Sequence, residues 1–99
     1  MDLLAIRYRY EAPEATQRDA HRPAHREWLR GQLADGIVVS AGAFGDGSGA
    51  LILLDAAIAG GIDGARALLE GDPFVVEGLA HDIEVAEWSP VMGAFSDPA

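Results

Sequence analysis

Four segments of the chain are predicted to form β-strands, two because apolar and polar residues alternate in them and two because they are short apolar runs. The first segment covers residues 2–10. One face of it carries Leu4, Ile6, Tyr8 and Tyr10, and the other carries Leu3, Ala5, Arg7 and Arg9. Residues 37–42 and 50–55 are short apolar runs joined by a glycine-rich segment, which predicts a hairpin. Residues 82–88 alternate again and predict the fourth strand.

Helical spacing of apolar residues predicts two helices. The stripe of the first consists of Trp28, Leu29 and Leu33, and that of the second consists of Ile62, Ala65, Leu68 and Leu69. Proline fits a helix without cost only in the first turn, so the first helix either begins near Arg22 or is kinked at Pro23. His25 is then expected in an early turn, and Gly36 ends the helix. The second helix is expected over residues 62–70, and a short turn that holds Phe74 and Val75 is expected after it.

The element order βαββαβ predicts an α+β, ferredoxin-like fold, a four-stranded antiparallel sheet with two helices on one face. The other face of the sheet would expose apolar side chains, among them Leu3, Ala5, Ala86 and Trp88. Pairing of two such faces removes them from water, so we predict a homodimer. Residues 89–99 have no clear period and are expected to form a tail to a single domain spanning residues 1–99.

Composition narrows the classes of function. Hydrophobic residues make up 49% and charged residues 23% of the 99 residues, which is typical of one globular domain. The 16 acidic and 7 basic residues give a net charge of -9, which would repel nucleic acid and anionic lipid. The absence of cysteine excludes thiolate nucleophiles. No apolar run approaches the roughly 18 residues of a membrane span, and we expect a cytoplasmic protein.

Four motifs together resemble the YciI-like (YCII-related) family. They are RPAH at 22–25, WL at 28–29, DGIVVSAG at 35–42 and GDPFVVEGL at 71–79. The resemblance implies a dimeric α/β barrel with an active site made of a histidine and an aspartate, which match His25 and Asp72. One branch of the family resembles dehydrochlorinases that act on chlorinated hydroxyquinone rings. The resemblance therefore implies proton-transfer chemistry, such as elimination or isomerisation, on a small carbonyl or phenolic compound.

The predicted topology independently brings His25 and Asp72 together. In βαββαβ the first helix starts at the end of the sheet where the second helix stops. A histidine titrates near pH ~6.5, so beside a carboxylate it can act as a general base without a cofactor. A purely structural role of both residues stays open. An aspartate before a proline often organises a turn, and a histidine often makes an ordinary capping or core contact.

Four more residues are candidates for binding a small-molecule substrate at the same rim. Arg22 could stabilise an enolate, Phe74 could form a wall, and Ser40 and His81 lie near strand ends. Ser40 lacks the surrounding motif of a catalytic nucleophile. His21 precedes His25 by four residues, a spacing that suits a metal, but the intervening proline makes this geometry insecure and no metal is expected.

Two non-catalytic interpretations remain open at this stage. The same pocket could hold a metabolite in a ligand-binding or accessory protein. Alternatively, the sheet surface and the tail could be an interaction module for a larger enzyme.

Overall fold

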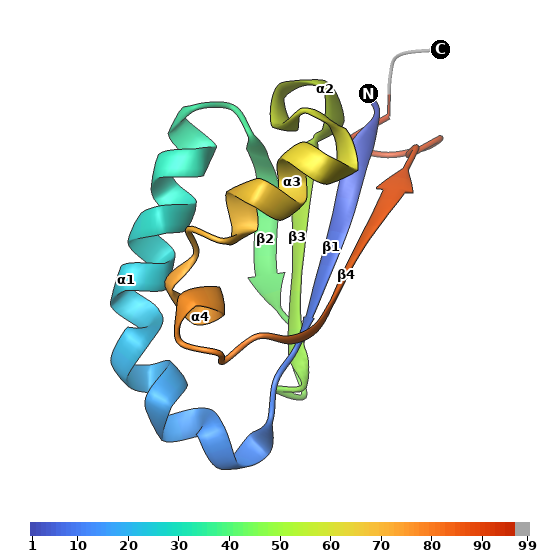
Figure 1. Cartoon of the computed structure of the whole chain (residues 1–99). Coiled ribbons are helices and arrows are strands. Elements are labelled where there is room, and N and C mark those ends of the chain that lie inside the picture. Colours follow the sequence, from blue (N-terminus) through green and yellow to red (C-terminus); the bar gives the residue numbers. More distant parts are fainter. Residues whose placement is uncertain (97–99) are drawn as a thin grey trace.

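Four antiparallel strands form one sheet in the order β2-β3-β1-β4, and the helices lie on one of its faces (Figure 1). The computed structural model describes residues 1–96. The strands are β1 (Leu3–Arg9), β2 (Val38–Ala43), β3 (Gly49–Asp55) and β4 (His81–Trp88). The fold is ferredoxin-like, as predicted, and each strand lies within one residue of its expected bounds. Residues 97–99 of the predicted tail lie outside the described residues.

The sheet face toward the helices carries the core. In the pairing of β1 with β3, Leu4 lies opposite Leu54, and Ile6 lies opposite Ile52. The buried core cluster consists of Leu4, Ile6, Tyr8, Val38, Ala50, Ile52, Leu54, Ala65 and Leu69. The members of this cluster that lie on β1 are Leu4, Ile6 and Tyr8, which the alternation had placed together on one face.

The long helix α1 (Ala15–Ala34) follows the short 3-10 turn η1 (Ala12–Glu14), so of the two starts that the sequence left open the earlier one is observed. Pro23 lies inside α1, which curves over its N-terminal half (Figure 1). The early turns are held by Arg18, whose guanidinium donates to the Glu11 carbonyl at 2.7 Å and lies 4.6 Å from the centre of the Tyr10 ring. These contacts offset the single backbone hydrogen bond that a proline removes. His25 is consequently in the middle of the helix.

Three shorter helices connect β3 to β4, where one was expected. They are α2 (Ala56–Ala59), α3 (Gly61–Leu69) and α4 (Pro73–Val76). The sequence pattern predicted α3 but not α2, and it assigned a turn in place of α4. Asp55 caps α2 by accepting from the Ile58 amide at 3.1 Å, and Gly60 separates α2 from α3 with φ 84°. That left-handed conformation favours glycine, so the chain turns there without strain.

Two further features bear on the surface of the molecule. Leu33, expected in the core, is 56% exposed because a cavity lies between its end of α1 and β2.

Within residues 1–96, no helix is both long and apolar enough to cross a membrane.

Candidate active site

Asp72 is the centre of a buried hydrogen-bond cluster. Its side chain is 0% exposed, and its Oδ1 lies 2.6 Å from His25 Nδ1 and accepts from the Phe74 amide at 3.0 Å. Its Oδ2 accepts from the Tyr8 hydroxyl at 2.8 Å. Asp72 is thus both the N-cap of α4 and the partner of His25. The turn-organising role and the histidine-pairing role, which were alternatives in sequence, are combined in one carboxylate.

The surroundings of His25 fix which of its nitrogens is available. Nδ1 faces the Asp72 carboxylate, which accepts hydrogen bonds only, so Nδ1 carries the proton. Nε2 makes no hydrogen bond with any residue from 1 to 96, and no buried side-chain nitrogen or oxygen among them lacks a partner. Nε2 is therefore open to solvent. The imidazole is held flat against the Phe74 ring, with 4.0 Å between ring centres and 1° between ring planes.

Tyr8 is the member of the cluster that the sequence did not reveal. Alternation placed it on the core face of β1, and it is indeed completely buried. Burial raises the pKa of Tyr8 well above its usual value, and the charge and hydrogen bond of Asp72 raise it further. The hydroxyl therefore stays protonated and keeps donating. A buried tyrosine generally needs a hydrogen-bond partner, and that rule was the available signal.

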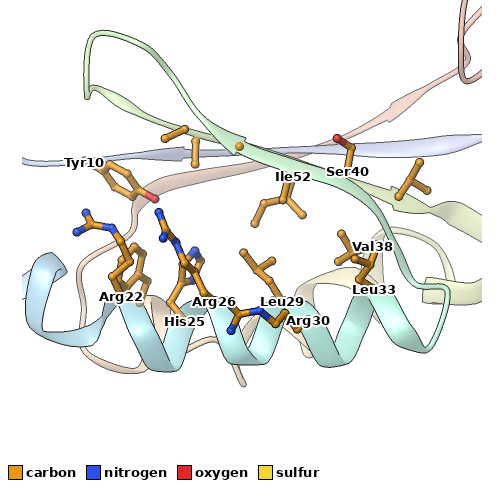
Figure 2. Close-up of a pocket in the computed structure, with 16 residues that line it drawn as sticks. Tyr10, Arg22, His25, Arg26, Leu29, Arg30, Leu33, Val38, Ser40 and Ile52 are labelled. Carbon is orange, nitrogen blue, oxygen red and sulfur yellow. The ribbon is translucent and has the colours of Figure 1, made fainter.

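A cavity of about 550 Å³ lies between α1 and the β2 side of the sheet (Figure 2). Its aromatic and basic lining consists of Tyr10, Arg22, His25, Arg26, Arg30 and Phe74. Its remaining lining is Leu29, Leu33, Val38, Val39, Ser40, Ala41, Gly42, Ala43, Ala50 and Ile52. Of these described lining residues none is acidic. The volume suits a small organic ligand.

Tyr10 adds a second hydroxyl, which points into this cavity (Figure 2). Its ring meets the Phe74 ring edge to face, at 5.9 Å between centres and 85° between planes. Burial is the main cause that raises the pKa of Tyr10, and the Asp72 charge adds to it, against the lowering effect of Arg18 and Arg22. Tyr10 is therefore a neutral donor at the cavity wall.

The four other residues predicted to bind a substrate differ in their position relative to the cavity. Arg22 and Phe74 line the cavity beside His25. Ser40 also lines it, but its hydroxyl points away from α1 (Figure 2), because the residue pairs with Leu53 and its side chain is on the opposite sheet face. His81 is not among the cavity residues. It lies on β4, the edge strand farthest from β2.

The structure also separates the histidines that were considered for a metal. His21 Nε2 lies 3.9 Å from Glu77 Oε2, and His81 Nε2 lies 2.6 Å from Glu14 Oε1. Among residues 1–96, no group of three or more histidine, aspartate or glutamate side chains is placed to hold a metal ion.

Fold and site define a small α+β protein whose buried His25–Asp72 pair opens onto one cavity. The chain belongs to the YCII-related domain family, which it matches over residues 2–89. The family predicted from the sequence motifs is thereby confirmed. Comparison with curated proteins gives no match.

A solved structure shares the fold. It is the 5-chloro-2-hydroxyhydroquinone dehydrochlorinase (TftG) from Burkholderia phenoliruptrix AC1100, in complex with 2,5-dihydroxybenzoquinone. The TM-score is 0.76 and the sequence identity is 21%, over 96% of this chain and 99% of that one. At this identity the likeness establishes the common fold.

Proposed function

We propose that this YciI-like protein is a cofactor-free enzyme that uses His25 as a general base in an elimination on a small phenolic or carbonyl compound. The observation that carries the proposal is the arrangement of His25. Nδ1 is held by Asp72, while Nε2 is left open beside the cavity. An imidazole fixed in this tautomer presents its basic lone pair to a bound molecule.

The reaction balances without an oxidant or a reductant. In the keto tautomer of the ring, in which the carbon that bears chlorine is tetrahedral, Nε2 takes a proton from the neighbouring carbon, which lies next to a carbonyl group. The electron pair released forms a carbon–carbon double bond, and a chloride on the neighbouring carbon leaves with its bonding electrons. The net change is loss of HCl, and the imidazolium that forms lies next to the Asp72 carboxylate.

A hydrogen-bond donor for the oxygens of the substrate is present during this step. The Tyr10 hydroxyl lines the same cavity and stays protonated, because burial raises its pKa. A neutral donor aimed at a carbonyl oxygen stabilises the negative charge that develops there when the proton leaves. The shared fold with a dehydrochlorinase supports the choice of chloride as the leaving group.

The test is chloride release from 5-chloro-2-hydroxyhydroquinone, measured without oxygen because such rings oxidise in air. We expect His25→Gln to lower the rate at least ~100-fold, the usual contribution of a general base. The matched control is His21→Gln, one helical turn earlier on α1, whose side chain is 39% exposed. That variant should retain the native rate. Circular dichroism checks that both variants fold.

Two results would reject the proposal. A His25→Gln variant that releases chloride at the native rate removes His25 as the base. Native protein that releases no chloride from this ring or from other chlorinated hydroquinones removes dehydrochlorination as the reaction.

We further propose a homodimer formed through the sheet face turned away from the helices. Pairing of β1 with β4 places Leu3 beside Trp88 and Ala5 beside Ala86 on that face, although Leu3, expected to be exposed there, is already buried within one chain at 1% exposure. Trp88 remains 43% exposed and Leu51 38% exposed, which leaves apolar surface for a second copy to cover. Sedimentation equilibrium should give the mass of two chains.

The cytoplasmic location expected from the sequence stays a prediction. So does the absence of a nucleic-acid partner, which rests on the net charge of -9.

A further inference from the structure

Positive charge is concentrated at the cavity of an otherwise acidic protein. Arg22, Arg26 and Arg30 follow one another at intervals of four residues along α1, so they share one face of the helix (Figure 2). These three are among only 7 basic residues in a chain whose net charge is -9. Since no described lining residue is acidic, the charged residues of the cavity wall are basic, whereas the molecule as a whole carries a negative net charge.

The three arginines differ in whether a neighbouring carboxylate forms an ion pair with them. Arg22 forms an ion pair with Asp19. Arg30 forms an ion pair with Glu27 at 3.1 Å. Arg26 takes part in no ion pair or side-chain hydrogen bond within the described part of the chain. Its five N–H donors remain available to a ligand.

We propose that the cavity selects a planar organic anion and that Arg26 binds its charged oxygen. This inference rests on the proposed function and names the substrate class of that site. The guanidinium presents paired donors to an oxyanion, and charge-assisted hydrogen bonds of this kind are about twice as strong as neutral ones. Arg26 directly follows His25, so a molecule that it holds is delivered next to the base.

The same contact assists the chemistry. Removal of a proton by Nε2 increases the negative charge on the oxygens of the bound molecule. A cation that is already in place stabilises this charge without further rearrangement. Arg26 is thus a determinant of substrate charge, whereas His25 is the group that moves the proton.

The experiment measures binding and does not depend on turnover. The probe is 2,5-dihydroxybenzoquinone, whose hydroxyls are conjugated with carbonyls and ionise like carboxylic acids. The comparator is 2,5-dimethoxybenzoquinone, which has the same ring but cannot ionise. Dissociation constants are measured by calorimetry at low and high salt for the native protein and for Arg26→Gln, Arg26→Lys and Arg66→Gln.

We expect Arg26→Gln to weaken binding of the anion about 10-fold or more, the effect of losing a charge-assisted contact. Arg26→Lys should retain part of the affinity, and high salt should weaken binding to the native protein. Arg66 is exposed on α3 and does not line the cavity, so Arg66→Gln changes the net charge equally and should leave affinity within twofold. The dimethoxy comparator should bind weakly and without response to Arg26→Gln.

Four outcomes would overturn the inference. The first is that the native protein does not bind the anion, and the second is that Arg26→Gln binds it with native affinity. The third is that Arg66→Gln binds the anion as weakly as Arg26→Gln does. The fourth is that the dimethoxy comparator binds as tightly as the anion. His25→Gln separates this inference from the proposed function. Loss of chloride release with retained anion binding supports both, whereas native turnover in His25→Gln rejects the general base and leaves Arg26 to be judged by binding alone.

Discussion

Two histidine–carboxylate pairs in this molecule have the same length and very different surroundings. His25 Nδ1 and Asp72 Oδ1 are 2.6 Å apart, and so are His81 Nε2 and Glu14 Oε1. The side chains of the first pair are 9% and 0% exposed, whereas those of the second are 29% and 30% exposed. Only the first pair borders the cavity.

The difference lies in what else holds each carboxylate. Asp72 accepts from the Tyr8 hydroxyl and the Phe74 amide in addition to His25. Glu14 makes no other side-chain hydrogen bond among residues 1–96. A carboxylate that accepts from several buried donors is held in one position, whereas a solvated one exchanges its partner with water. A short distance by itself therefore does not identify a site.

Removal of the buried carboxylate should have the largest effect on stability. Asp72→Ala leaves His25, the Tyr8 hydroxyl and the Phe74 amide without their acceptor, so we expect a loss of about 3 to 5 kcal/mol in the free energy of unfolding. Urea denaturation measures it. The corresponding truncation in the exposed pair, Glu14→Ala, should cost at most about 1 kcal/mol. Equal losses in the two variants would contradict the comparison.

Tyr8→Phe should have an intermediate effect. It deletes the donor to Asp72 Oδ2 and keeps the ring, so we expect a loss of about 1.5 to 3 kcal/mol at neutral pH. The control is Tyr10→Phe, because the Tyr10 hydroxyl has no hydrogen-bond partner in the described residues, and its loss should change stability by less than about 0.5 kcal/mol.

The contribution of Tyr8 to the free energy of unfolding also depends on pH. Folding raises the pKa of Tyr8 above its ordinary value of 10.0, mainly through burial. The unfolded chain therefore loses this proton first as pH rises, so the contribution is complete below pH 10.0 and declines above it. The stability difference between native protein and Tyr8→Phe should shrink above that pH. A difference that grows in alkali would show that the sign is wrong.

His81→Gln should have a small effect. The pair that it breaks is partly solvated, and we expect a change below about 1 kcal/mol in the free energy of unfolding. Because His81 is absent from the cavity lining, chloride release and quinone binding should match the native protein. A loss of activity would return His81 to the substrate-binding group in which the sequence had placed it.

Local pattern was sufficient for most of the fold. Alternation located β1 and β4, and short apolar runs on either side of a glycine-rich segment located β2 and β3. Propensity left open whether the first helix begins near Arg22 or continues past Pro23, and the contacts of Arg18 with Glu11 and Tyr10 hold the turns of α1 that precede the proline. Propensity failed at α2, a four-residue helix that depends on the Asp55 cap.

The candidate site was predictable only in part. Topology and motif together placed His25 near Asp72, and the two side chains do meet. Neither argument could order the residues across the sheet, so His81 was grouped with the cavity, although β4 and β2 are at opposite edges. Nor could the face of Ser40 be assigned, because β2 changes register between Val38 and Ser40.

The amino-acid sequence by itself determined the strand pattern, the family and the two residues of the buried histidine–aspartate pair, because each depends on periodicity or on a short motif. Only the tertiary structure decided that Tyr8 completes the pair, that Nε2 is open, and that Arg26 is unpaired at the cavity. The reason is physical. Whether a polar side chain has a hydrogen-bond or ion-pair partner depends on groups that are far apart in the chain, such as Tyr8 and Asp72, and these groups meet only after folding.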